Sequence, residues 1–322
     1  MIAVNGIILV LSCQKHLNTR LKHFKLPKDD YGGWKVIYVI GDLFMNCDYK
    51  FVSRGSTSGS TSGSTSGSTS GSTSGSTSGS TSGSTSGSSA GASEGSVADF
   101  LIVKCEDSYI HLLKKLGLAL KYLYETFDIK EGVLRANDDL IFNESMLRAF
   151  LDSPKMIKNN DASEATAIDF LGKSSIAKSL FARDFVFADA KRPPTNSMHL
   201  VYYYDDHPED FDNPQHNIKG VGIYNYTKQP YVPAFIFGPL YYISNKSCAI
   251  LINHLENINY DVFHYDEKTD SYPYTIEDCG VSFIFYYNNI DILHNDNWIK
   301  NDDANAASAA NDVIAIHTNM FK

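Results

Sequence analysis

A Gly-Ser-Thr-Ser repeat, which fills residues from about 55 to 96, sets the first limit on how this chain can fold. The repeat contains no side chain that could bury much apolar surface, so we expect a disordered coil there. Roughly 280 residues remain, which is enough for one sizeable hydrophobic core. The repeat is either a recently expanded simple sequence or an engineered linker that replaces a natural loop, and its residues fit both origins.

The two flanks of the repeat look like parts of the same domain. An apolar run at residues 7–11 and a strand-like segment at 34–42 precede the repeat, and another buried strand is expected at 99–103. A long loop costs little closure entropy, because the penalty grows only with the logarithm of its length. The sequence therefore predicts a single domain over residues 1–322, interrupted by the coil.

Helical and strand-like patterns alternate after the repeat. Apolar residues at helical spacing predict a helix over residues 109–127, with Asp107 and Ser108 suited to its N-cap. A strand is expected at residues 132–136 and a helix from Asn143 onward. Further strands are expected at residues 167–171, 199–204, 241–244, 290–293 and 313–317, and further helices at 246–255 and 276–287. This alternation predicts an α/β fold with a mostly parallel central sheet.

Charge and cysteine usage exclude several classes of function. The net charge of −9, without a long basic run, argues against nucleic-acid binding. Five scattered cysteines with no C-x-x-C pair indicate free thiols in a reducing compartment, so we expect a cytoplasmic protein. The apolar run near the N-terminus is too short to span a membrane, and we expect no transmembrane segment in this chain.

The acidic turn Asn137-Asp138-Asp139 is the first candidate for chemistry. It follows a buried strand, and ligands of open α/β sheets bind at the carboxyl ends of strands. Neighbouring carboxylates repel each other, and a bound Mg²⁺ or Mn²⁺ would compensate this repulsion and could hold a diphosphate. Alternatively, Asp138 and Asp139 cap the helix that starts near Asn143. Residue spacing alone leaves both interpretations open.

Three further residues are candidates, each with a purely structural alternative. Asp278 could act as a general base, although acidic residues also favour helix N-termini for electrostatic reasons. Gly238 could let the backbone approach a ligand, or could simply form a turn. His317 could ligate a metal, although lone histidines are more often structural, and His294 competes for the same role.

Taken in chain order, these segments resemble the beta-1,3-galactosyltransferase/Fringe-like glycosyltransferase family. The similar segments are residues 34–42, 107–115 with 120–122, 135–143, 235–244, Glu277-Asp278 with Asn289-Ile290, and 313–317 with Met320. Each segment is short, but together they follow the order of the family's motifs and cover nearly all of the chain outside the coil.

The resemblance implies a GT-A fold, a Rossmann-like α/β domain that binds a UDP-sugar and Mn²⁺ or Mg²⁺. In this family the sugar is transferred with inversion to a hydroxyl of a glycan or glycoprotein acceptor. Carried over by position, Asp139 would ligate the metal and His317 would be its second protein ligand.

The resemblance also implies roles in donor binding and catalysis. Asn137 would lie near the ribose, and Asp138 would support the site. Gly238 would line the loop on the sugar side, and Lys115 would belong to the donor site. Asp278 would be the catalytic base.

Two departures from the family's pattern leave the donor sugar open. Asn137 stands where the family has an acidic residue, and the family's Gly-Gly-Gly is reduced to Gly238-Pro239-Leu240. The chain also lacks the membrane anchor and lumenal cysteines of most members. It looks like a cytoplasmic, viral or microbial version, or a Golgi-lumenal type of protein trimmed of its anchor.

Two other functions compete with an active transferase. A catalytically inactive nucleotide-sugar or glycan-binding protein on the same fold would explain Asn137 and the altered glycine loop. A nucleotidyltransferase would share the acidic metal turn, but would need a more basic N-terminal loop than one carrying Lys15 and Arg20.

Overall fold

The computed structural model describes residues 1–17, 19–23, 30–53, 99–158, 165–185, 192–206, 223–301 and 312–318. The Gly/Ser/Thr repeat, for which we expect a coil, lies outside these residues, as does Met320. The flanks of the repeat end in neighbouring strands of one sheet.

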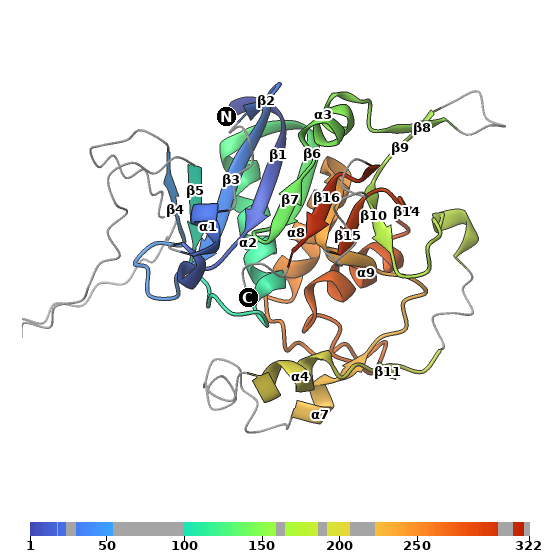
Figure 1. The fold of residues 1–322 in the computed structure, drawn as a ribbon. Helices are drawn as coiled ribbons and strands as arrows, with labels where there is room; N and C mark the ends of the chain where they lie inside the picture. The colour runs from blue at the N-terminus through green and yellow to red at the C-terminus, as the bar shows by residue number, and fades with distance from the viewer. Residues whose placement is uncertain are drawn as a thin grey trace, which may run out of the picture.

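A large mixed sheet forms the centre of the fold (Figure 1). In spatial order its strands are β14 (Ile292–His294), β10 (Phe170–Ser174), β13 (Ile236–Ser244), β6 (Phe127–Asn137), β1 (Ile2–Leu11), β3 (Trp34–Gly41), β5 (Asp99–Val103) and β4 (Tyr49–Val52), with β2 (Asp30–Tyr31) beside β3. The chain is therefore a mixed α/β protein.

The direction of the strands divides the sheet into two parts. The central strands β6, β1, β3 and β5 run parallel to one another, as expected for an α/β fold. Beyond β6, strand β13 runs antiparallel to both β6 and β10, and at the other edge β4 runs antiparallel to β5. The expected parallel sheet thus describes the centre, and antiparallel strands extend it on both sides.

Both faces of the sheet are covered, because its central strands are apolar on both sides. In β1, Ile7 and Leu9 belong to one hydrophobic core, whereas Ile8 and Val10 belong to the other. The first core lies under α2 (Leu112–Thr126), α8 (Asn245–Asn257) and α9 (Glu277–Tyr287). The second lies under α3 (Glu144–Asp152) and a small sheet of β15 (Ile299–Asn301), β16 (Ala315–His317) and β7 (Leu140–Phe142).

Shorter elements complete the described part of the chain. They are η1 (Gln14–His16), α1 (Arg20–His23), β8 (Met156–Lys158), β9 (Ala165–Ala167), η2 (Ala182–Asp184), β11 (Thr195–Asn196), α4 (His199–Asp206), α7 (Ile223–Tyr226) and β12 (Lys228–Gln229). Among the residues described, no helix is long and apolar enough to cross a membrane.

Two local expectations were wrong. Residues 199–204 form the start of helix α4 and not a strand, because Leu200, Val201 and Tyr204 are buried together at helical spacing. Helix α2 begins after His111, which makes no side-chain cap, and not after Asp107. The carboxylate of Asp107 instead accepts a hydrogen bond from the backbone N–H of Gly41 at 3.0 Å.

The cap of α3 provides a test of this local structure. The side chain of Asn143 accepts hydrogen bonds from the backbone N–H groups of Ser145 at 3.1 Å and Met146 at 3.3 Å. We predict that Asn143→Ala lowers the free energy of unfolding by about 1 kcal/mol, since it leaves helix amides unsatisfied. Urea unfolding would measure this loss. Arg148→Lys, which keeps a cation beside Glu144 and the Tyr31 ring, should cost about 0.5 kcal/mol or less. Equal losses in the two variants would contradict the assignment of the cap.

Candidate functional site

The candidate site lies at the edge of the sheet where β1 and β6 end. These strands are parallel and in register to their last residues, Leu11 and Asn137. Strand β13 runs the opposite way, so its early residue Gly238 reaches the same edge, and the N–H of Gly238 donates to Asp278 at the start of α9. Strand β16 pairs with β7, directly after the acidic turn, and brings His317 to this edge.

Asp138 is buried within the acidic turn and is held by the segment that follows β1. Its carboxylate accepts hydrogen bonds from the hydroxyl of Ser12 at 2.6 Å and from Nδ1 of His16 at 3.0 Å. The guanidinium of Arg20 donates to its other oxygen at 3.2 Å. Burial lowers the pKa of His16, although the adjacent carboxylate opposes this. Asp138 therefore ties two loops together, and its role in supporting a donor site stays a prediction.

Asp139 presents one oxygen that is paired and one that is not. Its Oδ2 lies 3.2 Å from Nε2 of His317 and 3.4 Å from the guanidinium of Arg20. Among the residues described, its buried Oδ1 has no hydrogen-bond partner. Burial raises the pKa of Asp139, but the hydrogen bond and charge of His317 and the charge of Arg20 outweigh it, so the net shift is downward. The carboxylate is thus ionised, and one of its two oxygens has no hydrogen-bond partner among the described residues.

The turn does not cap the following helix. Asn143 caps α3 with its own side chain, and the described contacts of Asp138 and Asp139 run to Ser12, His16, Arg20 and His317 instead. The structural alternative for the two carboxylates is therefore wrong. The two carboxylates pair with groups at the end of the sheet and not with the N-terminus of the helix.

Arg135 connects the acidic turn to the helix that carries Asp278. Its side chain is almost completely buried, and one of its nitrogens donates both to the Asn137 amide oxygen at 2.6 Å and to the carbonyl of Gly238. Its other terminal nitrogen lies 3.2 Å from Glu277. Because these contacts reach three separate segments, Arg135 fixes their relative positions.

Glu277 and Asp278 are adjacent, but they have different environments. Glu277 is buried, and its oxygens accept from Arg135 and from the hydroxyl of Tyr241. Burial raises its pKa to about 7, despite the opposing charge of Arg135. Asp278 is partly exposed, and its carboxylate accepts from the N–H groups of Gly238 at 3.0 Å and Cys279 at 2.9 Å. Asp278 is therefore the one of the two that a substrate could reach.

The pKa of Asp278 suits a base. Burial raises it, and the N–H groups of Gly238 and Cys279 hold the rise in check by favouring the ionised form. A carboxylate with a raised pKa is a stronger proton acceptor while it remains ionised.

Gly238 is placed where a side chain would crowd the site. A Cβ atom at this position would lie 3.3 Å from side-chain atoms of both Asp278 and Glu277. The absence of a side chain keeps the backbone close to the carboxylate of Asp278, and its contact with a donor sugar stays a prediction.

Lys115 lies at the site, but its ammonium group already has partners. The side chain is 2% exposed, pairs with Asp107 and donates to the carbonyl of Ser12 at 2.8 Å. It therefore supports the backbone after β1, and its direct contact with a donor stays a prediction. His294, the competitor of His317, has its ring nitrogens engaged by the N–H of Ser174 at 2.9 Å and by Asp296 at 2.8 Å.

Sequence reasoning missed Ser12, His16 and Arg135 as parts of the site, and noted Arg20 only as a basic residue. Ser12 and His16 lie in the segment after β1. The topology indicates that this segment belongs to the site, because the loop after β1 must meet the loop after β6 once these strands pair in parallel. For Arg135 the signal is a charged residue within the otherwise apolar run of residues 133–136, because a buried charge needs a partner.

The described residues were also tested for a metal centre. Within them, no group of three or more His, Cys, Asp or Glu side chains is arranged to hold a metal ion. The buried, unpartnered Oδ1 of Asp139 and the nearby imidazole of His317 nevertheless fit a cation that also takes oxygen ligands from a diphosphate. Asp139 and His317 therefore fit such an ion only when the diphosphate of the substrate supplies further oxygen ligands.

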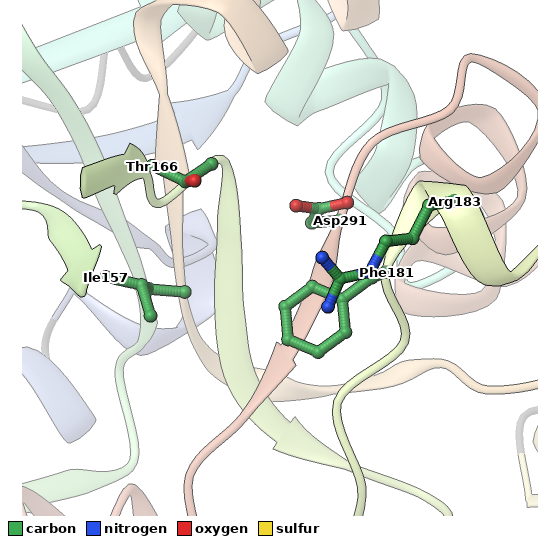
Figure 2. Close-up of a pocket in the computed structure, with 5 residues that line it drawn as sticks. All are labelled: Ile157, Thr166, Phe181, Arg183 and Asp291. Atoms are coloured by element: carbon green, nitrogen blue, oxygen red, sulfur yellow. The ribbon is translucent and has the colours of Figure 1, made fainter. Parts of the chain in front are cut away.

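A separate pocket lies at the opposite end of the strands from the candidate site, where β10 and β14 begin (Figure 2). It has a volume of about 160 Å³ and is lined by Ile157, Thr166, Phe181, Arg183 and Asp291. In Figure 2, Arg183 and Asp291 face Ile157 and Thr166 across the opening. Because β10 and β6 point the same way, this pocket is remote from the acidic turn.

No protein-family model matches this chain, and no curated protein matches it either. Function therefore has to be argued from the geometry of the site.

The raised pKa of Glu277 predicts a specific pH dependence. Between its ordinary pKa of 4.5 and about 7, the folded protein holds a proton that the unfolded chain has lost. The free energy of unfolding contributed by this group therefore falls as the pH rises through that window. Glu277→Gln should remove this pH dependence, which amounts to roughly 3 kcal/mol at most.

Urea unfolding at about pH 5 and about pH 7.5 would measure the effect as the difference between variant and wild type. Glu144→Gln, at the exposed start of α3, is the matched control and should follow the wild type. Identical pH dependence in wild type and Glu277→Gln would contradict the raised pKa.

Proposed function

We propose that this protein is an inverting glycosyltransferase that moves a sugar from a UDP-sugar to a hydroxyl of a glycan or glycoprotein, assisted by Mn²⁺ or Mg²⁺. The observation that carries the proposal is the hydrogen bond between the Gly238 N–H and Asp278 at the edge of the sheet that also holds Asp139 and His317. A candidate base, a candidate metal pair and a close backbone segment thus share one site. A GT-A fold is part of the same proposal.

On the donor side, Asp139 and His317 would hold the metal ion, which supplies positive charge to the departing diphosphate when bound. Asn137 is fixed by Arg135 and offers its amide to the ribose. Asp138 keeps the loop after β1 in place through Ser12. Each of these residues acts by binding or by orientation.

On the acceptor side, Asp278 would remove the proton from the attacking hydroxyl. The hydroxyl oxygen forms a bond to the anomeric carbon from the face opposite the diphosphate, and the bond from that carbon to the diphosphate oxygen breaks. The proton resides on Asp278, and the two N–H groups that bind its carboxylate keep it oriented throughout.

One observation favours a second candidate, a nucleotide-sugar or glycan-binding protein without catalysis. Arg20 already neutralises part of the charge of both Asp138 and Asp139, so the turn is compensated without a metal ion. Turnover of a panel of UDP-sugars, with and without Mn²⁺, separates the two candidates. Turnover supports the transferase, whereas UDP binding that raises the melting temperature without any turnover supports the binding protein.

We further propose a cytoplasmic location. All five cysteines are free, including Cys105 and Cys248 in the core, where they have packing roles. Free thiols in this number suit a reducing compartment.

The first prediction concerns the base. Asp278→Asn should lower kcat by roughly 1000-fold, because the amide cannot accept the acceptor's proton. UDP affinity, measured by calorimetry, should stay within about twofold of the wild type, since Asp278 acts on the other substrate. Asp128→Asn, at the partly exposed start of β6 and thus at the opposite end of this strand from the acidic turn, is the control and should behave as the wild type. Loss of UDP binding in Asp278→Asn would place this residue in the donor site instead.

The second prediction concerns the metal. Asp139→Ala should raise the Kd for UDP in the presence of Mn²⁺ by at least about tenfold, because it removes the proposed metal ligand. Without Mn²⁺, wild type and variant should bind UDP with similar, weak affinity. Unchanged Mn²⁺-dependent binding in the variant would exclude Asp139 as a ligand.

A further inference from the structure

The small pocket at the far end of the strands has walls that the backbone holds in place (Figure 2). On one side, Ile157 of β8 pairs with Thr166 of β9 in an antiparallel hairpin. On the other side, the backbones of Leu180 and Ile292 exchange two hydrogen bonds, at 2.7 Å and 2.8 Å. Both walls belong to the folded structure, so the pocket is formed before any ligand arrives, as is usual for small-molecule sites.

The inner side of the pocket is apolar, and its volume limits what can enter. Ile157 and Phe181 are partly buried and pack against the second core. The volume of about 160 Å³ is well below the roughly 300–1,000 Å³ of sites for drug-sized ligands. A nucleotide-sugar therefore does not fit, whereas a molecule with few non-hydrogen atoms does.

Arg183 brings a positive charge to this opening. Its guanidinium carbon lies 4.9 Å from the centroid of the Phe181 ring, and Figure 2 shows the group over that ring. Stacking on an aromatic face orients the planar guanidinium and leaves the N–H groups at its edge available. Among the described residues, its ion pairing is limited to a long contact of 3.9 Å between Nε and Asp184.

Asp291 brings a negative charge to the same opening. Its Oδ1 accepts a hydrogen bond from the N–H of Ala182 at 2.7 Å, which orients the carboxylate. Within the part of the chain that the structure describes, its Oδ2 has no hydrogen-bond partner, and the carboxylate forms no ion pair with Arg183. Two opposite charges thus line one small opening without neutralising each other.

We propose that this pocket binds a free α-amino acid with a short aliphatic side chain. The carboxylate of the ligand pairs with Arg183, because a guanidinium can donate two parallel N–H···O bonds to a carboxylate. The ammonium group of the ligand pairs with Asp291, and the side chain packs against Phe181 and Ile157. A simple anion or cation would satisfy one of the two charges, whereas a zwitterion satisfies both.

This site is separate from the proposed transfer reaction. The pocket lies where β10 and β14 begin, at the opposite end of the strands from the acidic turn. Its test is therefore a binding measurement without a UDP-sugar, and a negative result would leave the proposed transferase untouched.

Saturation-transfer NMR of the full chain with L-alanine measures this binding. We expect a saturable signal with a Kd on the order of 1 mM. Two probes of nearly the same size each lack one charge, since propionate has no ammonium group and ethylamine has no carboxylate. Each should bind the wild type at least about tenfold more weakly than L-alanine, because one charge of the pocket is left without a partner.

Two variants assign the two contacts. Arg183→Gln and Asp291→Asn should each raise the Kd for L-alanine at least about tenfold. Arg183→Gln should leave ethylamine binding unchanged, and Asp291→Asn should leave propionate binding unchanged. The amide that replaces Asp291 keeps an oxygen for the N–H of Ala182, so the wall of the pocket is retained. Lys121→Gln and Glu256→Gln are the controls, because they remove charges from helices on the other face of the sheet, and both should bind L-alanine as the wild type does.

Several results would overturn the amino-acid site. One is the absence of saturable L-alanine binding at concentrations of tens of millimolar. Equal affinities for propionate and L-alanine would show a simple anion site, and equal affinities for ethylamine and L-alanine a simple cation site. A wild-type Kd for L-alanine in both Arg183→Gln and Asp291→Asn would place the bound amino acid elsewhere on the protein.

Discussion

The site depends on the contacts that the buried guanidinium of Arg135 makes. It joins the end of β6 to the start of β13 and to α9 through Asn137, the carbonyl of Gly238 and Glu277. Its carbon also lies 5.4 Å from the centroid of the Tyr241 ring, on the neighbouring strand. A buried guanidinium without hydrogen-bond partners is costly, so these contacts favour one arrangement of the three segments.

The rest of the site is organised around the balance of charge at one edge of the sheet. Asp138 and Asp139 repel each other, and Arg20 lies between them, while Lys115 and Asp107 neutralise each other nearby. These contacts consume most of the available donors and acceptors. Among the described residues of this network, Oδ1 of Asp139 and Nε of Arg135 lack a hydrogen-bond partner, and each such buried atom is a candidate contact for a ligand, an ion or a water.

The buried strands and the long helices followed from periodicity and apolar content, as for β1, β3 and α2. Segment 199–204 was misjudged because its closely spaced aromatic residues have high strand propensity, and only tertiary packing reveals its helical face. At the site, Asp139, Asp278 and His317 were expected together. Residues such as Ser12 could not be, because their position depends on which strands pair, and local patterns do not encode pairing over 126 residues.

The central claim is that the acidic turn and His317 hold a metal ion together with a UDP-sugar. A crystal grown with UDP and Mn²⁺, with diffraction recorded at the manganese absorption edge, tests it most directly. The account predicts an anomalous peak next to Asp139 and His317, with the diphosphate beside it and the ribose near Asn137. UDP bound elsewhere, or bound at this edge with no manganese peak next to Asp139, would contradict the account.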